Sequence, residues 1–187
     1  MFQIREFTEK DIPAVRAFTD AVIGKNYFSE AELLENLQKS QAKTDNGNVV
    51  TSFVLVDGNK IMGLRLAYAP GLWSKGKGKK LRPDLWRTPH AETAYFQSLF
   101  LSLEAQGQGW GPKLSAASIE SFRKLGATAI VTHAWKESPN NSSIRYLSKQ
   151  GFESVAVHPE YWIDVDYECV LDGKPCRCTA EEMILYI

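Results

Sequence analysis

The pattern of hydrophobic and polar positions changes its period several times along the chain. Apolar residues recur every three or four positions in some segments, which indicates amphipathic helices, and alternate or run together in others, which indicates strands. Capping residues and glycines mark where these segments begin and end. The predicted elements, in chain order, are a strand at 2–7, a helix from Thr8 to Gly24, a second helix capped at Ser29, strands at 49–56 and 60–69, a strand at 94–103, a helix at 112–124, a strand at 127–134, a helix at 140–150, and strands at 152–157 and 179–187.

These elements interleave in the order βαα, ββ, βα, βα, ββ. Such an order is typical of the α/β class, so we expect one mixed sheet with helices on both of its faces. The polar residues 43–48 are expected to form a loop, and residues 70–89 break all periodicity. A chain of 187 residues suits one domain with a sizeable core. We therefore predict a single domain over 1–187, with a basic insertion at 70–93 and a C-terminal hairpin region at 158–187.

Charge and composition narrow the function classes. Lys plus Arg equals Asp plus Glu at 22 each, so net charge gives no reason to expect nucleic acid or an anionic membrane as a partner. No apolar run approaches the length of a membrane span, and Met1–Lys10 lacks the apolar core of a signal peptide. Three cysteines, an odd number, do not indicate a disulfide framework. We expect a cytoplasmic protein.

The segment Gln106–Gly111 carries the strongest chemical signal. Three glycines in six residues let the backbone come close to a ligand, and Pro112 suits the first turn of the helix that follows. Free N–H groups at such a helix start, together with the helix dipole, form an anion site that is well suited to phosphates. The spacing fits neither the dinucleotide G-x-G-x-x-G pattern nor a Walker A loop. The segment therefore predicts a different phosphorylated cofactor.

Read as Q-x-x-G-x-G, this segment resembles the acetyl-CoA pyrophosphate loop of the GNAT superfamily of N-acetyltransferases. Two further pieces support the resemblance. The strand Tyr95–Leu101 ends five residues before Gln106, as the family requires. The run N-x-x-S-I-x-x-L-x-x-x-G-F from Asn140 to Phe152 is similar to the family's second cofactor motif, usually N-x-x-A-x-x-x-Y-x-x-x-G-F. The predicted order of elements is similar to the GNAT fold over almost the full chain.

The resemblance implies an enzyme that moves acetyl from acetyl-CoA to a primary amine by direct attack. It places the pantetheine arm on the backbone of the strand before the loop, with the Leu99 N–H as an oxyanion donor, and the pyrophosphate on the loop itself. The implied cofactor-binding residues are Leu99, Phe100, Leu101, Gln106, Gly107, Gln108, Gly109, Trp110, Gly111, Asn140 and Ser143. The implied partner is a small-molecule or peptide amine acceptor, and a homodimer is a further expectation.

The catalytic residues are less clearly marked. The family's usual acid is a tyrosine four residues before the glycine of G-F, where this chain has Leu147. Tyr146 lies one place earlier, about 100° around a helix, and is the candidate acid, with core packing as the alternative. His133 titrates in the right range and is the candidate base, with a structural histidine in its strand as the alternative. Glu92, Glu104 or ordered water are other proton acceptors. The missing tyrosine leaves open a non-catalytic coenzyme A-binding or sensor module.

The insertion at 70–89 carries two tryptophans, Trp73 and Trp86, and several basic residues. Its basic residues are Lys75, Lys77, Lys79, Lys80, Arg82 and Arg87. Such a charge run is usually a solvated face. Because the segment leads directly into the strand before the glycine loop, the functional alternative is a lid over the acceptor site.

Cys169, Asp172, Cys176 and Cys178 have a knuckle-like spacing. Three thiolates and one carboxylate can hold zinc tetrahedrally, with His158 as the other candidate for the fourth ligand. An aspartate is an unusual fourth ligand for a structural zinc site. We therefore expect three small buried cysteines in a C-terminal hairpin turn and no metal.

Overall fold

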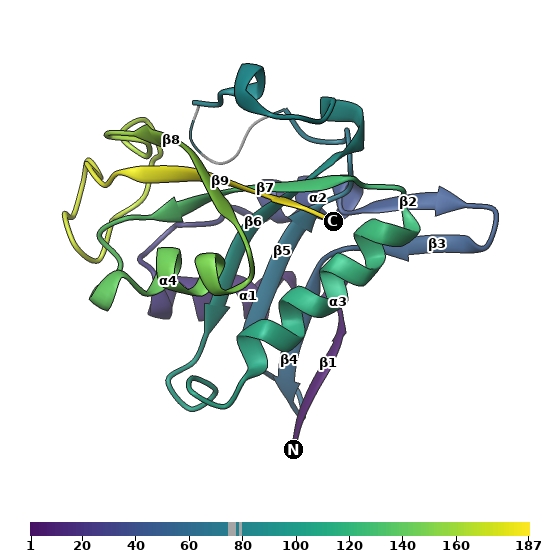
Figure 1. The fold of residues 1–187 in the computed structure, drawn as a ribbon. Coiled ribbons are helices and arrows are strands. Elements are labelled where there is room, and N and C mark those ends of the chain that lie inside the picture. The colour runs from purple at the N-terminus through teal and green to yellow at the C-terminus, as the bar shows by residue number, and fades with distance from the viewer. Residues whose placement is uncertain (75–77, 79) are drawn as a thin grey trace.

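A seven-stranded mixed sheet forms the centre of the computed structural model, which describes residues 1–74, 78 and 80–187 (Figure 1). The strand order is β1-β4-β5-β6-β7-β9-β8, and only the β6–β7 pair is parallel. The strands are β1 (Phe2–Glu6), β4 (Phe53–Asp57), β5 (Lys60–Tyr68), β6 (Thr93–Leu101), β7 (Ala129–Trp135), β8 (Glu153–His158) and β9 (Ala180–Tyr186).

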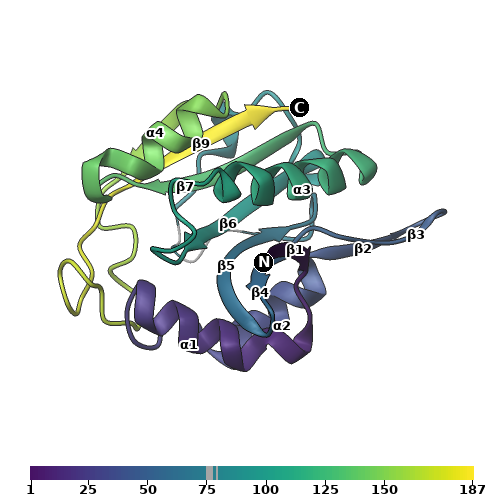
Figure 2. The same cartoon turned by 90° about the horizontal axis from the view of Figure 1, so that it is seen from below.

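In the described part of the chain, four α-helices cover the two faces of this sheet, as the sequence predicts. The helices are α1 (Ile12–Val22), α2 (Glu30–Lys39), α3 (Trp110–Lys124) and α4 (Ser142–Lys149). Figure 2 shows α1 and α2 on one side of the sheet and α3 and α4 on the other. Short 3-10 helices lie at η1 (Glu9–Asp11), η2 (Pro83–Leu85), η3 (His90–Glu92) and η4 (Pro139–Asn141). No helix in the described ranges combines the length and the apolar character that crossing a membrane requires.

Local chemistry explains where the helices start. At α2, Ser29 accepts from the Glu32 N–H (3.1 Å), and the Glu32 carboxylate accepts from the Ser29 N–H (2.8 Å), which completes a capping box. At α4 the helix starts two residues later than predicted, because Asn140 (φ 55°) and Asn141 (φ 53°) are left-handed. Asparagine tolerates this conformation better than most residues, so the pair forms a turn before the helix.

The prediction of a polar loop at 43–48 followed by one strand is wrong. The chain instead forms a separate hairpin of β2 (Gln41–Thr44) and β3 (Gly47–Val50), which projects from the molecule in Figure 1. Thr51 and Ser52 then separate β3 from β4. Both residues are fully buried, and their hydroxyls donate to the Ser40 and Ala67 carbonyls (2.9 and 3.0 Å). These hydrogen bonds hold the turn that divides the expected strand.

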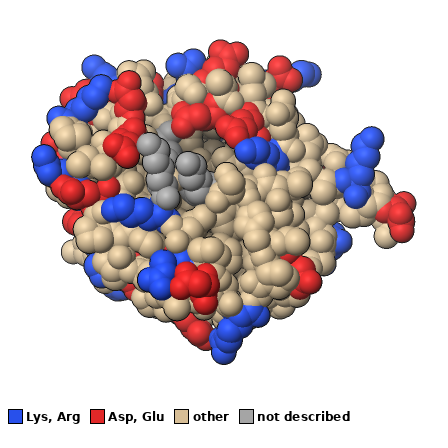
Figure 3. Space-filling model, turned by 90° about the horizontal axis from the view of Figure 1, so that it is seen from above, with Lys and Arg blue, Asp and Glu red and all other residues tan. Residues whose placement is uncertain are grey.

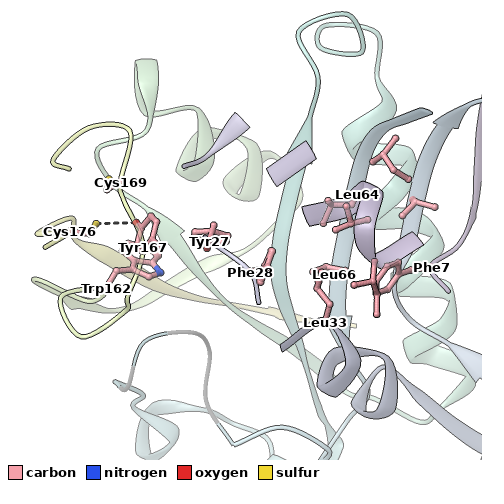
Figure 4. Packing of buried hydrophobic residues seen from close by; sticks show 14 of the residues in the cluster. Phe7, Tyr27, Phe28, Leu33, Leu64, Leu66, Trp162, Tyr167, Cys169 and Cys176 are labelled. Carbon is pink, nitrogen blue, oxygen red and sulfur yellow. Dashed lines mark hydrogen bonds between the residues drawn. The ribbon is translucent and has the colours of Figure 1, made fainter. Parts of the chain in front are cut away.

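The core occupies both sides of the sheet. On the α1–α2 side, large apolar side chains extend into the segment between β8 and β9 (Figure 4). This cluster includes Phe7, Tyr27, Phe28, Leu33, Leu64, Leu66, Trp162, Tyr167, Cys169 and Cys176. The α3–α4 side is filled by a second cluster that includes Phe96, Phe122, Ile130, Leu147, Phe152 and Met183. Burial on both faces fixes the sheet as a platform for the features described next.

Candidate active site

The parallel strands β6 and β7 separate halfway along their length. They pair only where Thr93–Phe96 runs beside Ala129–Thr132, although β6 continues to Leu101. From there on, β7 pairs only with β9. The second half of β6 therefore has one edge open to a ligand.

A β-bulge lies at the point of separation. On its other edge β6 pairs with β5 along most of its length. Leu66 of β5 lies opposite Ser98, but the next residue, Ala67, lies opposite Phe96, so Gln97 is an extra residue in β6. A bulge bends its strand and increases the local twist. The Gln97 bulge thus accounts for the direction in which β6 turns away from β7.

The backbone amides of Leu99 and Leu101 point into this open edge. The Ser102 N–H donates to the Met62 carbonyl of β5 at 2.8 Å. Because alternate residues of an antiparallel strand direct their amides to the same side, Leu99 and Leu101 face the opposite side. The Leu101 carbonyl accordingly accepts from the Gln106 side chain in the glycine loop (3.1 Å).

The glycine loop leaves the start of α3 without a cap. Gly107 (φ 73°) and Gly109 (φ 79°) adopt left-handed backbone that glycine takes without strain, and Gly109 is the N-cap. No side chain caps α3, and among the described residues the N–H groups of Gly107, Gln108 and Gly109 have no backbone acceptor. Because such donors and the helix dipole together favour an anion, this helix start is the candidate anion site.

Trp110 anchors the loop to the sheet through its side chain. Its ring packs edge-to-face on Phe2 with centroids 5.8 Å apart, and the Lys113 ammonium lies 4.2 Å from its centroid. Lys113 therefore adds a positive charge in the first turn of α3. It is part of the anion site that the glycine pattern alone did not indicate.

On the far side of the gap, the start of α4 is tied to the end of β7. The Ser143 hydroxyl accepts a hydrogen bond from the backbone N–H of Trp135 at 3.3 Å. Asn140 is exposed in its left-handed turn, and its side chain makes no hydrogen bond within the described residues. The predicted contacts of Ser143 and Asn140 with the pantetheine arm remain predictions.

Tyr146 and Leu147 lie in different environments. Leu147 is buried in the α3–α4 core. Tyr146 is partly buried against the same core and faces α3, where its hydroxyl lies 2.7 Å from the Ser115 hydroxyl. The same Ser115 oxygen accepts from the Arg65 guanidinium at 2.7 Å. The Arg65 guanidinium carbon also lies 3.9 Å from the centroid of the Phe96 ring. A chain of polar contacts therefore leads from a buried cation to the candidate acid.

Arg65, like Ser115 and Lys113, is a residue of this site that sequence reasoning missed. It is 3% exposed, and its Nε has no hydrogen-bond partner within the described residues. Burial lowers the pKa of Arg65 to about 10, while Tyr146 raises it through its charge and its hydrogen bond. A lone arginine inside the apolar strand 60–69 was the available signal.

His133 is enclosed on both ring nitrogens. Its Nδ1 lies 2.7 Å from the Tyr95 hydroxyl, its Nε2 lies 2.9 Å from the Lys80 carbonyl, and its ring stacks on Tyr161 at 4.3 Å. Because a carbonyl only accepts, Nε2 carries the proton and Nδ1 accepts from Tyr95. Burial lowers the pKa of His133 to about 3; the Lys80 carbonyl opposes this shift and His158 adds to it. A base role for His133 remains a prediction, and any proton would reach it through Tyr95.

The insertion packs onto the sheet face that carries His133. Trp73 and Trp86 are buried, and their indole N–H groups donate to the Thr93 carbonyl (2.7 Å) and the Glu182 carboxylate (2.8 Å). Glu182, fully buried, also accepts from His158 at 2.7 Å. The described part of the insertion therefore covers this face of the sheet and is held there by buried contacts.

The basic residues of the insertion do not form a free cationic surface where they are described. Lys80 donates to the Pro159 carbonyl (2.7 Å), Arg82 pairs with Asp84, and Arg87 lies over the Tyr186 ring. Figure 3, which views the molecule from this side, shows basic side chains scattered among acidic ones. Lys75, Lys77 and Lys79 lie outside the described residues.

A cavity of about 320 Å³ lies between the α1–α2 connection and the segment after β8. It has charged side chains of both signs. Its lining residues are Arg16, Asn26, Phe28, Ser29, Glu32, Val165 and Asp166. The cavity has polar groups in its lining and lies on the α1–α2 side of the sheet.

A splayed parallel strand pair beside an uncapped, glycine-rich helix start is the architecture expected of an acyl-coenzyme A transferase. Residues 18–152 match the family model described as the acetyltransferase (GNAT) family. This match covers more than half of the sequence, and the chain belongs to the GNAT acetyltransferase family. The family's enzymes use acetyl-CoA, so the enzyme class and the acyl donor predicted from the sequence are confirmed.

Solved structures agree with this fold. The ribosomal-protein-S18-alanine N-acetyltransferase from Escherichia coli is 16% identical, with a TM-score of 0.65 over 100% of this chain and 94% of that one. Ard1 from Thermoplasma volcanium is 18% identical, with a TM-score of 0.64 over 100% and 97%. The putative acetyltransferase yncA from Salmonella typhimurium, solved with its cofactor acetyl-CoA, is 18% identical, with a TM-score of 0.63 over 100% and 94%. The comparison with curated proteins found no match.

Proposed function

We propose that this protein transfers acetyl from acetyl-CoA to a primary amine at the open edge of β6. The observation that carries the proposal is the adjacency of that edge to the uncapped start of α3. Coenzyme A joins a pyrophosphate to a peptide-like pantetheine arm. The helix start suits the pyrophosphate, and the amides of Leu99 and Leu101 suit the arm.

In this mechanism the amine nitrogen attacks the thioester carbonyl, a C–N bond forms, and the carbonyl oxygen becomes an oxyanion. The Leu99 N–H stabilises that charge. When the C–S bond breaks, Tyr146 protonates the thiolate. The Tyr146 and Ser115 hydroxyls lie 2.7 Å apart. With Ser115 as the donor the tyrosine proton stays available for the thiolate, and the charge of Arg65, which donates to Ser115, stabilises the phenolate that results.

The amine must lose its proton before or during attack. The Glu92 carboxylate, at the beginning of β6, accepts a hydrogen bond from the Thr128 hydroxyl. The Glu104 carboxylate, in the loop after β6, pairs with Lys60. Both carboxylates are exposed and lie at opposite ends of the strand. We therefore assign this proton to ordered water in the cleft, with binding and orientation supplying most of the rate.

For the acceptor we propose a cationic amine that enters from the α1–α2 side. The cavity there presents the carboxylates of Glu32 and Asp166 beside the Arg16 guanidinium. Carboxylates attract a protonated amine, and an arginine beside them favours an acceptor that also carries an acidic or carbonyl group. Small amines and peptide N-termini both satisfy this chemistry.

Coenzyme A binding to a loop variant tests the proposal. Gly109→Glu places a carboxylate where the pyrophosphate is expected, so calorimetry should show at least a tenfold loss of affinity. The matched control is Gly58→Glu in the β4–β5 turn, which has the same left-handed backbone (φ 59°) and open surroundings. Unchanged affinity in Gly109→Glu would contradict the assigned cofactor loop.

A second candidate function is a coenzyme A-binding or sensor module without catalysis. It is favoured by the buried Leu147 at the position where the family usually has its tyrosine. Coenzyme A binding with only slow acetyl-CoA hydrolysis, and no acetylated product from a broad panel of amines and peptides, would support this alternative over the enzyme.

A further inference from the structure

Four side chains with metal-ligating atoms converge in the segment between β8 and β9. The sulfurs of Cys169, Cys176 and Cys178 and a carboxylate oxygen of Asp172 all lie within 4.8 Å of one another. The Cys169 and Cys178 sulfurs are 3.9 Å apart, and the Cys178 sulfur lies 3.2 Å from Asp172 Oδ2. A tetrahedral site with Zn–S bonds of about 2.3 Å has sulfur–sulfur edges of about 3.8 Å. The Cys169–Cys178 edge already has nearly this length, and the other ligand atoms lie within 4.8 Å of it and of one another.

The backbone builds this cluster through a tight turn. Cys169 and Gly173 exchange two backbone hydrogen bonds of 2.8 Å each, and Gly173 is left-handed (φ 73°). The turn brings Asp172 back beside Cys169, and the chain then returns with Cys176 and Cys178. The segment from 159 to 179 contains no helix or strand of its own. A crosslink here would therefore hold a part of the chain that little regular structure supports.

The surroundings of the sulfurs donate hydrogen bonds. The Tyr167 hydroxyl donates to the Cys176 sulfur at 3.1 Å, as the dashed line in Figure 4 shows. The Leu171 N–H donates to the Cys169 sulfur at 3.4 Å, and the Arg177 N–H donates to Asp172 Oδ2 at 3.0 Å. Donors of this kind orient metal ligands and offset the charge of thiolates.

The three sulfurs are shielded from solvent, as a closed structural site requires. Cys176 is 0% exposed, Cys178 2% and Cys169 6%. Trp135 packs against the hydrophobic cluster that contains the three cysteines, and its indole N–H is buried without a hydrogen-bond partner within the described residues.

We propose that Cys169, Asp172, Cys176 and Cys178 bind one Zn²⁺ ion in a tetrahedral structural site. Binding forms three Zn–S bonds and one Zn–O bond, and each thiol gives its proton to solvent. No electron transfer is involved. Thiolate-rich tetrahedral sites select zinc among the common divalent ions. Within the described residues no fifth metal-ligating group joins these four, so the site has the four ligands of a closed structural site.

The other candidate ligands of this region have different partners. The His158 Nε2 donates to the Glu182 carboxylate, which also accepts from the Trp86 indole N–H and the Arg82 backbone N–H. His133 is engaged by Tyr95 and Lys80. That second cluster is a satisfied hydrogen-bond network, so the zinc proposal does not extend to it.

The position of the site gives the ion a structural role. Val165 and Asp166 of the same segment line the cavity. Gly24 in the α1–α2 connection lies so close that an added Cβ would be 1.9 Å from the Glu168 carbonyl oxygen. Zinc at the cysteines would therefore fix one wall of the cavity against α1 and α2.

Elemental analysis of the full-length protein, purified with reductant and without chelator, tests the proposal. We expect about one zinc per chain, and apo-protein titrated with Co²⁺ should show thiolate-to-cobalt charge-transfer bands and intense tetrahedral visible bands. Cys176→Ser and Cys178→Ser should lose stoichiometric zinc. Asp166→Asn, a carboxylate on the same segment outside the cluster, is the matched control and should retain it.

Thiol titration of the wild-type protein keeps the test decisive if the cysteine variants fail to fold. Three thiols should react after chelation and become protected when Zn²⁺ is added back, with a rise in the melting temperature. Wild-type protein that holds no zinc, gives no cobalt–thiolate bands and shows no zinc protection would overturn the proposal. A stable Cys169–Cys178 disulfide in the protein isolated with reductant would overturn it as well.

Discussion

At the scale of single residues, the active site depends on which of two adjacent side chains faces the ligand. A one-residue step on α4 puts Leu147 in the core and Tyr146 against α3. The family's motif places its tyrosine at the position that Leu147 occupies here. In the mechanism proposed above the hydroxyl comes from the neighbouring residue, Tyr146, whose contact with Ser115 gives it a defined orientation.

Replacing Tyr146 by phenylalanine removes only the hydroxyl. If Tyr146 is the acid, turnover should fall by about two orders of magnitude with little change in acetyl-CoA affinity. Steady-state kinetics and calorimetry on the same preparation separate these two quantities. Full activity in Tyr146→Phe would remove this residue from the mechanism.

The companion variant Leu147→Tyr restores the family's usual residue, but the structure changes what it should do. Leu147 is 5% exposed among close-packed core side chains, so a larger, polar ring should destabilise the fold by about 1–3 kcal/mol. Chemical denaturation measures this loss. A faster enzyme with unchanged stability would show that the α4 helix turns relative to this structure.

At the scale of elements, the insertion between β5 and β6 is held by one buried carboxylate. The Glu182 carboxylate of β9 accepts hydrogen bonds from the Trp86 indole N–H, the Arg82 backbone N–H and the His158 ring. Elements far apart in the sequence therefore meet at a single group. A buried carboxylate that loses a donor pays a desolvation penalty that is not recovered elsewhere.

Trp86→Phe should accordingly lower the free energy of unfolding by about 1–3 kcal/mol, beyond its small change in volume. Equilibrium denaturation measures the change. Leu85→Ala is the control, because Leu85 is the neighbouring residue of the same segment and is 47% exposed. Equal stability losses in the two variants would argue against the Glu182 contact as the anchor.

Local signals predicted the elements well where one segment determines its own structure. The capping pair Ser29 and Glu32, the glycines of the cofactor loop and the G-F after α4 all act within a few residues. The β2–β3 hairpin was missed although its two-residue turn, Asp45–Asn46, is a local signal. The break between β3 and β4 was not predictable locally, because Thr51 and Ser52 donate to the carbonyls of Ser40 and Ala67.

The site was predictable to a similar extent. The loop that starts α3 and the strand with the open edge were identified by their spacing. Arg65 and Ser115 were not, because they meet Tyr146 only across three separate elements. The convergence of the three cysteines on Asp172 likewise depends on a turn that spacing alone does not specify.

At the scale of the whole molecule, the enclosed His133 links folding to pH. Its pKa falls from 6.5 to about 3 in the folded state, where Tyr95, Tyr161 and His158 surround it. Between these pH values the unfolded chain binds a proton that the folded chain does not. The stability is therefore fully present above pH 6.5 and is lost progressively as pH falls toward 3.

The expected contribution is on the order of 5 kcal/mol across that range. His133→Gln keeps one donor and one acceptor but does not titrate, so its stability should fall less steeply between pH 6.5 and pH 4. Urea denaturation at a series of pH values measures the slope. The comparison variant is His90→Gln, at an exposed histidine. A slope in His133→Gln that equals the parent's would contradict the assignment.

The separation of β6 from β7 places a row of unpaired amides near the middle of the sheet, where most proteins have their slowest-exchanging hydrogens. A pantetheine arm lying there would complete the sheet from outside the chain. Acetyl-CoA would then act as a removable strand. At a free concentration a hundred times its dissociation constant, it would add about 2.7 kcal/mol to the stability of the fold. The cellular supply of acetyl-CoA would thereby set how long each copy survives proteases as well as how fast it works.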